Sequence, residues 1–176
     1  MVTLQLLKTE DEEALLAFEL INKEWFESFV EARDEDFFSE EGIKDHIDFY
    51  LSEHKAGRIY PMLLKNEQGV ICGRANLYNI NREKELGFIG YRIGEDFISQ
   101  GLATYATKEL IDIAREALAL NVLVATASTD NLASQKVLSK NGFKRVAFKP
   151  EFTIVDGEII DCYEYRCVIK QLSAAT

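Results

Sequence analysis

Apolar residues recur every three to four positions in two segments near the start of the chain, residues 11–32 and 40–55. This period is typical of helices that bury one face in a core. Residues 3–7, which precede them, have the character of a short strand. Aromatic stripes at helical spacing more often belong to a core than to a ligand site, so we expect both helices to pack inward.

The middle of the chain has the pattern of a β-meander. Residues 60–65, 70–79 and 86–93 are strand-like, and turn-forming or charged residues separate them. Helical spacing then returns at 104–117, and residues 121–129 form an almost unbroken apolar run. Such a run after a helix predicts a strand that is buried on both faces and has a parallel neighbour.

The last third of the chain predicts a short helix and a hairpin. Residues 130–140 have helical spacing, with Asp130 or Asn131 as the cap and Gly142 as a left-handed terminator. The remaining expected elements are a strand at 145–148, a hairpin turn at Asp156-Gly157 and a final strand at 162–169.

This order of elements places the chain in the α/β class with a mixed sheet. Of its 176 residues, 47% are hydrophobic and 28% charged, and there is no repeat or linker, so we expect one domain over residues 1–176. No stretch reaches the length of a membrane span, and the first residues do not resemble a secretory signal. We therefore expect a soluble, cytoplasmic protein.

Cysteine and histidine spacing indicates no metal site. The three cysteines, Cys72, Cys162 and Cys167, match neither a zinc knuckle nor a redox pair. His46 and His54 have no further ligand types at metal spacing, so solvated helix positions are the favoured interpretation. No metal is expected.

The formal net charge of −10 disfavours nucleic acid and anionic membranes as partners. Cationic partners are favoured instead. Since the overall field repels phosphate, a phosphate ligand would need directed backbone amides and a local basic cluster.

The stretch ISQGLATYATKELIDIA, residues 98–114, places unhindered backbone where a helix begins. The first N–H groups of a helix lack internal partners and carry the positive end of the helix dipole, so they favour an anion such as phosphate. A tight strand-to-helix turn is the plainer interpretation. The additional glycines of a Rossmann loop and the Gly-Lys-Ser/Thr of a Walker loop are absent.

A second pattern follows 30 residues later, with Asn131 and Ser134 three positions apart and Asn141-Gly142-Phe143 at the end of the same predicted helix. Polar residues three apart share one helical face. On its own, this pattern indicates a capped helix rather than a ligand site.

Together the two patterns resemble the GNAT superfamily of acyl-CoA-dependent N-acetyltransferases. The phosphate loop of that family reads Gln/Arg-x-x-Gly-x-Gly/Ala, and Gly101 and Ala103 match it, while Ile98 stands where Gln or Arg is usual. The surrounding order is similar to the RimJ/RimL-like branch, which acetylates ribosomal proteins, over nearly the whole chain. The resemblance implies a single-domain fold with a mixed, mostly antiparallel central sheet flanked by helices.

The resemblance also implies an acetyl-CoA site. Asn131 and the strand that carries Tyr91 and Ile93 would contact the pantetheine arm and the thioester. Lys136 and Lys140, with Lys144 and Arg145 beyond, are either helpers for the 3′-phosphate or solvated surface charge. Backbone amides would hold the pyrophosphate at Gln100, Gly101, Leu102, Ala103 and Thr104.

Acyl transfer to an amine needs a base for the nitrogen and a hydrogen-bond donor for the departing thiolate. The donor in many family members is a tyrosine, but the matching position here is Leu138. The resemblance to the RimJ/RimL-like branch assigns Ser134 to the thiolate and Glu151 to the base. Glu151 is equally readable as an ordinary exposed glutamate, and Glu85 is the next candidate.

We therefore expect an acetyl-CoA-dependent N-acetyltransferase that transfers acetyl directly to a primary amine. A protein N-terminal α-amine of the ribosomal-protein type is the leading acceptor. The alternatives are a small-molecule amine (a polyamine, an amino acid or an antibiotic) and a non-catalytic CoA-binding module. Acidic residues between Glu24 and Asp36 would attract a cationic acceptor or are simply solvated. A monomer or a homodimer is expected.

Overall fold

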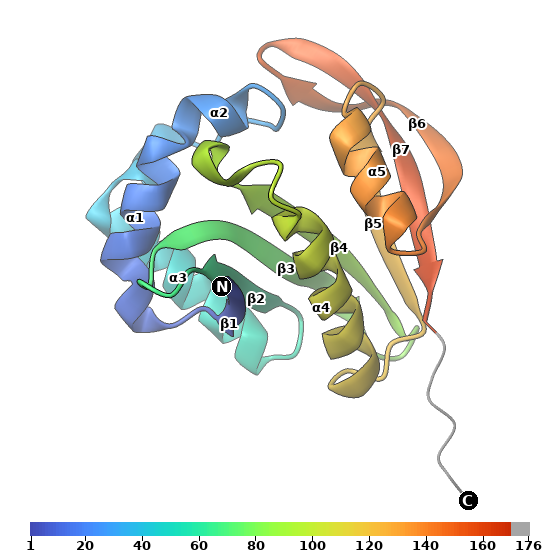
Figure 1. Cartoon of the computed structure of the whole chain (residues 1–176), viewed down its shortest axis with the longest axis horizontal. Helices are drawn as coiled ribbons and strands as arrows, with labels where there is room; N and C mark the ends of the chain where they lie inside the picture. Colours follow the sequence, from blue (N-terminus) through green and yellow to red (C-terminus); the bar gives the residue numbers. More distant parts are fainter. Residues whose placement is uncertain (170–176) are drawn as a thin grey trace, which may run out of the picture.

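The structure, a computed structural model, describes residues 1–169, and these form a seven-stranded sheet with helices packed on both of its faces (Figure 1). The strands are β1 (Thr3–Leu6), β2 (Tyr60–Lys65), β3 (Ile71–Asn81), β4 (Leu86–Ile93), β5 (Val122–Ser128), β6 (Lys144–Val155) and β7 (Glu158–Val168). The helices are α1 (Glu12–Ile21), α2 (Lys23–Glu27), α3 (Glu40–Lys55), α4 (Leu102–Glu116) and α5 (Leu132–Lys140), with 3-10 turns η1 (Thr9–Asp11), η2 (Glu35–Phe38) and η3 (Glu95–Phe97).

The sheet has the order β1-β2-β3-β4-β5-β7-β6, and every described pair is antiparallel except β4 with β5. The predicted meander is therefore confirmed, and so is the parallel neighbour of the apolar run. The run pairs in parallel because α4 carries the chain back across the sheet between β4 and β5. Leu123, Val124 and Ala125 in β5 are buried, as their composition predicted.

The parallel pair is short. β4 and β5 are in register only from Leu86 opposite Val122 to Phe88 opposite Val124. Beyond that point β4 stays paired with β3 as far as Ile93, and β5 stays paired with β7 as far as Ser128. The two strands therefore diverge, and one edge of each is left without a neighbouring strand where they part.

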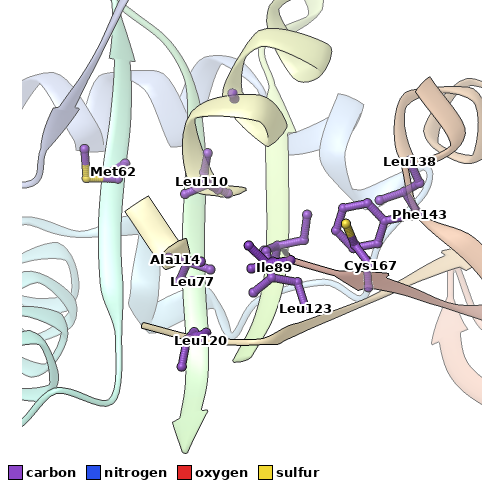
Figure 2. Packing of buried hydrophobic residues seen from close by; sticks show 14 of the residues in the cluster. Met62, Leu77, Ile89, Leu110, Ala114, Leu120, Leu123, Leu138, Phe143 and Cys167 are labelled. Atoms are coloured by element: carbon purple, nitrogen blue, oxygen red, sulfur yellow. The ribbon is translucent and has the colours of Figure 1, made fainter. Parts of the chain in front are cut away.

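Two hydrophobic clusters cover the two faces of the sheet. One joins β3, β4 and β5 to α4 and α5, and Figure 2 shows Leu77, Ile89 and Leu110 packed within it. The other joins α1 and α3 to the opposite face. Strand alternation produces this division, since Leu64 contributes to the first cluster and the adjacent Leu63 to the second.

The single helix predicted over residues 11–32 is wrong, because α1 ends at Ile21 and α2 ends at Glu27. Asn22 lies at the break and is buried. Its side-chain Nδ2 donates to the carbonyl of Phe18 at 2.9 Å, and its Oδ1 accepts the N–H of Glu95 at the same distance. A contact with a segment far along the chain thus interrupts a pattern that is helical locally.

The predicted tail strands are too short. β6 covers 145–148 and continues to Val155, and β7 begins at Glu158, four residues before the expected start. The pairing of β6 with β7 shifts register between Lys149 and Thr153, where Pro150 has no N–H to donate. The hairpin turn at Asp156-Gly157 is confirmed, with both residues at positive φ. Within residues 1–169, no helix has both the length and the apolar character that crossing a bilayer requires.

Candidate active site

A cleft of about 990 Å³ lies where β4 and β5 diverge. One side is lined by the start of α4, by α5 and by the buried side of β4. The other side is lined by residues that follow α2, by β3 and by the β6–β7 hairpin. The cleft is thus bounded by groups from both faces of the sheet, which suits a reaction that joins two molecules.

The start of α4 offers backbone donors to this cleft. Gly101 is the cap residue at φ 75°, a left-handed conformation that glycine adopts without strain, and no described side chain caps the helix. The helix ladder begins with Tyr105 donating to the carbonyl of Gly101 at 3.0 Å. Among the described residues, nothing accepts from the N–H groups of Leu102, Ala103 and Thr104.

Four of the five predicted phosphate-loop residues line the cleft, namely Gly101 to Thr104. Gln100 is exposed and does not line it. Its side-chain Nε2 instead lies 3.5 Å from the carbonyl oxygen of Asp96.

A hydroxyl pair lies on the same side of the cleft as this turn. The Tyr91 hydroxyl is 2.9 Å from Oγ of Ser134 and 3.5 Å from the Ser134 carbonyl oxygen. Burial raises the pKa of the Tyr91 phenol, so it keeps its proton at neutral pH. Asn131 caps α5 by accepting the N–H of Ser134 at 3.0 Å, as the capped-helix interpretation predicts, and it also lines the cleft.

The strand that carries Tyr91 and Ile93 lines the cleft at the point where β4 has lost contact with β5. The carbonyl of Ile93 accepts the indole N–H of Trp25 at 3.1 Å, which ties α2 to the end of β4. The unpaired edge of β4 is a place where an extended, amide-bearing ligand can add as a strand.

The predicted carboxylates do not reach the cleft. Glu151 lies in the register shift of β6 at φ 51°, is exposed, and donates its N–H to Oδ1 of Asp161 at 2.8 Å. The neighbouring Phe152 and Thr153 line the cleft, but Glu151 does not. Glu85 lies at the opposite end of β4 and accepts a hydrogen bond from the Asn121 side chain.

Among residues 1–169, Glu31 is the one carboxylate that lines the cleft. It is exposed and follows α2. The sequence gives it no distinguishing spacing within an acidic segment, and only the break of the helix at Asn22 and the end of α2 bring it to the cleft.

The basic candidates on and after α5 separate into two groups. Lys136 and Lys140 are exposed and line the cleft, whereas Lys144 and Arg145 do not. The Arg145 guanidinium lies 3.6 Å from the ring centroid of Tyr163. Leu138, at the position where a tyrosine is usual, is buried.

A further group of charged side chains lies on the α1–α3 side and was missed from the sequence. Arg33, Arg74 and Arg92 line the cleft there. Nη1 of Arg74 lies 2.7 Å from Oε1 of the buried Glu19, and Nη2 of Arg33 lies 3.7 Å from the same oxygen. These residues are distant in sequence, so no local pattern announces that they meet.

The expectation of solvated histidines is wrong for His46, which is partly buried and has its Nε2 2.6 Å from Nη2 of Arg74. A guanidinium only donates, so Nε2 is the acceptor and is unprotonated. Burial, followed by the charges of Arg74, Arg33 and Arg92, lowers the pKa of His46 to about 2. Among the described residues, His, Cys, Asp and Glu side chains nowhere gather in a group of three that would hold a metal.

Comparisons with known proteins indicate one family. Residues 2–144 match the family described as acetyltransferase (GNAT) domain. A Bacillus subtilis protein named as a candidate ribosomal N-acetyltransferase, YdaF, is 29% identical over 97% of this chain and 92% of its own length.

Solved structures have the same fold. The ribosomal-protein-S5-alanine acetyltransferase from Vibrio fischeri superposes with a TM-score of 0.92 at 21% identity, over 96% of this chain and 93% of that chain. RimL, a ribosomal L7/L12 α-N-protein acetyltransferase solved in complex with coenzyme A, superposes with a TM-score of 0.87 at 22% identity, over 96% and 94% of the two chains.

Proposed function

The chain belongs to the GNAT acetyltransferase family and is an N-acetyltransferase, and on that premise we propose that it transfers acetyl from acetyl-CoA directly to a protein N-terminal α-amine. One observation carries this proposal. The cleft between β4 and β5 has free backbone donors at one end and a hydroxyl pair beside the unpaired edge of β4.

The residues at the start of α4 suit a diphosphate. Leu102, Ala103 and Thr104 line the cleft at the positive end of the α4 dipole, and their N–H groups have no acceptor within residues 1–169. Directed donors of this kind offset the repulsion expected from a net charge of −10. Lys136 and Lys140 on the adjacent helix line the same cleft and would contact the 3′-phosphate.

The edge of β4 suits the pantetheine arm, whose amides pair with a strand. Tyr91 and Ile93 lie on the stretch of β4 that has lost its neighbour, so backbone donors there are available to the arm and to the thioester carbonyl. A donor at that carbonyl stabilises the negative charge that develops on its oxygen. Asn131, held as the cap of α5, lines the same cleft and would contact this arm.

Transfer forms a bond between the amine nitrogen and the acetyl carbon, breaks the bond between that carbon and sulfur, and moves one proton off the nitrogen and one onto the sulfur. We assign the sulfur's hydrogen bond to Ser134, with Tyr91 as its partner at 2.9 Å. The Tyr91 hydroxyl, which burial keeps protonated, donates to Oγ of Ser134 and leaves the serine O–H free to hydrogen-bond to the departing thiolate, and the sulfur then takes its proton from solvent.

A carboxylate on the acceptor side takes the proton from nitrogen. Glu151 is the residue that the family resemblance assigns, and Glu31 is the carboxylate that lines the cleft. Glu151 directly precedes the lining residues Phe152 and Thr153, so a role as the base requires the β6–β7 hairpin to move on acceptor binding.

The names of the solved relatives support a protein acceptor, because those proteins are named for ribosomal substrates. The test is release of free thiol from acetyl-CoA with a panel of amines: peptides with free N-termini, the same peptides blocked at the N-terminus, polyamines and amino acids. We expect release with the free peptides only. Release with polyamines alone would favour a small-molecule enzyme, and thermal stabilisation by CoA with no release would indicate a binding module.

A further inference from the structure

The side of the cleft opposite the hydroxyl pair carries an unusual excess of positive charge. Arg74 on β3 and Arg92 on β4 are directly opposed in the antiparallel register. Arg33, from the segment between α2 and η2, lies close enough to them to affect the pKa of Arg92. We call these three residues the arginine cluster. All three line the cleft.

The arginine cluster lies on the face of the sheet away from the proposed CoA site. Tyr91 and Ile93 pack against the hydrophobic cluster that contains α4. Arg92 falls between them, so strand alternation directs it to the other face, where its guanidinium lies 5.4 Å from the ring centroid of Phe26. The cluster is therefore on the side from which a second substrate would meet the thioester.

Counter-charges for the cluster are too few. Among residues 1–169, Glu19 is the one carboxylate within ion-pair distance, at 2.7 Å from Arg74 and 3.7 Å from Arg33, while Arg92 has no ion pair. His46 accepts a hydrogen bond from Arg74 and adds no negative charge. Three guanidinium groups thus share one carboxylate at ion-pair distance, while Glu27 and Glu31 line a small pocket with Arg33 and Arg92 without forming an ion pair among the described residues.

Placing three arginines together in this way lowers the stability of the fold. Arg74 is only 2% exposed, and like charges directly opposite on paired strands destabilise a sheet. The Nε atoms of Arg33 and Arg74 are buried and have no hydrogen-bond partner among the described residues. Burial, with the neighbouring arginines, lowers the pKa of Arg92 to about 10, which still leaves Arg92 charged at neutral pH.

Aromatic rings hold the three guanidinium groups in place. Phe37 lies 4.3 Å below Arg33, and Tyr50 lies 5.6 Å from Arg74. Together with Phe26 under Arg92, these contacts fix the groups before any ligand arrives. Fixed, partly desolvated guanidinium groups with free N–H donors are what an oxyanion binds best.

We infer that the arginine cluster binds an oxyanion, a carboxylate or a phosphate, that belongs to the same molecule as the amine to be acetylated. This inference rests on the proposed function and narrows its acceptor. Polyamines are disfavoured, because their remaining positive charges would meet the cluster. A peptide with an acidic residue close behind its N-terminus fits, and so does an amine that carries its own carboxylate.

The test compares acceptors that differ only in this charge. One arm uses peptides with Glu, Gln or Lys at positions two to four, and a second arm uses an amino acid and its amide, which separates a side-chain carboxylate from an α-carboxylate. We expect kcat/KM for the Glu peptides to exceed that for the Gln peptides by about tenfold or more, with the Lys peptides lowest. Equal values for Glu and Gln, or a preference for Lys, would overturn the inference.

The matched variants are Arg92→Gln and Arg82→Gln. Arg92 has no ion pair in the part of the chain that the structure describes, so its removal leaves no described carboxylate without its partner. Arg82 is an exposed arginine in the turn after β3. We expect Arg92→Gln to raise the KM of the Glu peptides without changing the KM of acetyl-CoA, and to abolish the preference for Glu over Gln. Arg82→Gln should change neither the KM of the Glu peptides nor the preference for Glu over Gln. A preference for Glu that survives in Arg92→Gln contradicts the inference.

A binding measurement separates this inference from the proposed function. Calorimetry in the presence of CoA measures the affinity of Glu and Gln peptides without requiring turnover. If acetyl is transferred to peptides of every charge alike, the function stands and the inference fails. If no amine is acetylated but Glu peptides still bind more tightly in the wild type than in Arg92→Gln, the oxyanion site stands and the proposed function fails.

Discussion

His46 shows how neighbours fix the ionisation of a single side chain. It accepts a hydrogen bond from Arg74, and Phe37 and Tyr50 pack against its ring. Burial is the first cause of its lowered pKa, and the charges of Arg74, Arg33 and Arg92 add to it. The imidazole is therefore a neutral acceptor that orients Arg74 rather than a proton carrier.

The pH dependence of stability follows from this residue. The pKa of His46 is about 2 in the folded chain and 6.5 in the ordinary state, so below pH 6.5 the unfolded chain binds a proton that the folded chain excludes. This contribution to stability is complete above pH 6.5 and falls with decreasing pH, by at most about 1.4 kcal/mol per pH unit.

Urea denaturation of the wild type and of His46→Gln at pH 7.5 and 5.5 measures the effect. Between these pH values we expect the wild type to lose about 1.4 kcal/mol more unfolding free energy than the variant. Both proteins contain the same carboxylates, so the difference between their losses of unfolding free energy reports on His46 alone. Identical losses in the two proteins would mean that His46 can be protonated in the folded state.

The hydroxyl pair gives a kinetic prediction. Ser134→Ala removes the proposed donor to sulfur and should lower kcat by about 10²-fold, the lower end of the usual effect of a positioned proton donor. Tyr91→Phe leaves Ser134 in place without its 2.9 Å partner, so a smaller loss, about tenfold, is expected. Steady-state kinetics should show the KM of acetyl-CoA nearly unchanged in both.

Ser139→Ala is the matched control for these variants, because Ser139 is an exposed serine on the same helix. It should keep wild-type kinetics. Full turnover in Ser134→Ala would remove this serine from the mechanism.

The two carboxylate candidates are distinguished by Glu31→Gln and Glu151→Gln, with Glu27→Gln as a control on α2. The base variant should lose about 10²-fold in kcat/KM, because the amine then gives up its proton to water alone. Glu31 lines the cleft and Glu151 does not, so a loss confined to Glu151→Gln would show that the β6–β7 hairpin moves on acceptor binding. Unchanged pH–rate profiles in both variants would exclude both residues.

A helix or strand can be predicted from the sequence when the residues that determine its bounds lie within the element itself. The periods that predicted α3, α4 and β5 lie within those segments. The break between α1 and α2 depends instead on the bond from Asn22 to Glu95, a contact across 73 positions. The register shift at Pro150 depends on how β6 pairs with β7, which the residues of β6 alone do not reveal.

The start of α4 provides a prediction with a matched control. Gly101 and Gly57 both have left-handed φ, 75° and 78°, and a Cβ at either would meet nothing within 4 Å. Gly101→Ala and Gly57→Ala should therefore lose similar unfolding free energy, about 1 kcal/mol. In Gly101→Ala, backbone strain at this position should also displace the N–H donors of Leu102 to Thr104.

Calorimetric titration with acetyl-CoA should consequently show a Kd raised several-fold in Gly101→Ala and unchanged in Gly57→Ala, which lies after α3. Equal affinities in the two variants would mean that the turn at Gly101 does not contact the ligand.

Across the full chain, local patterns predicted the fold class, the mixed sheet and four cleft-lining residues, Gly101 to Thr104. The arginine cluster and its carboxylate partner Glu19 were not predictable, because the four residues come from α1, a loop and two strands. The net charge of −10 even suggested a cationic partner. Total charge describes the outer field, whereas the sign inside a cleft depends on which side chains the topology brings there.

A crystal structure of the chain with CoA bound tests most directly whether the divergence of β4 and β5 forms the transfer site. We predict the pyrophosphate against the N–H groups of Leu102, Ala103 and Thr104, the pantetheine arm along the free edge of β4, and the sulfur within hydrogen-bond distance of Ser134. CoA bound outside this cleft, or with its sulfur away from Ser134 and Tyr91, would contradict the proposed site and its chemistry.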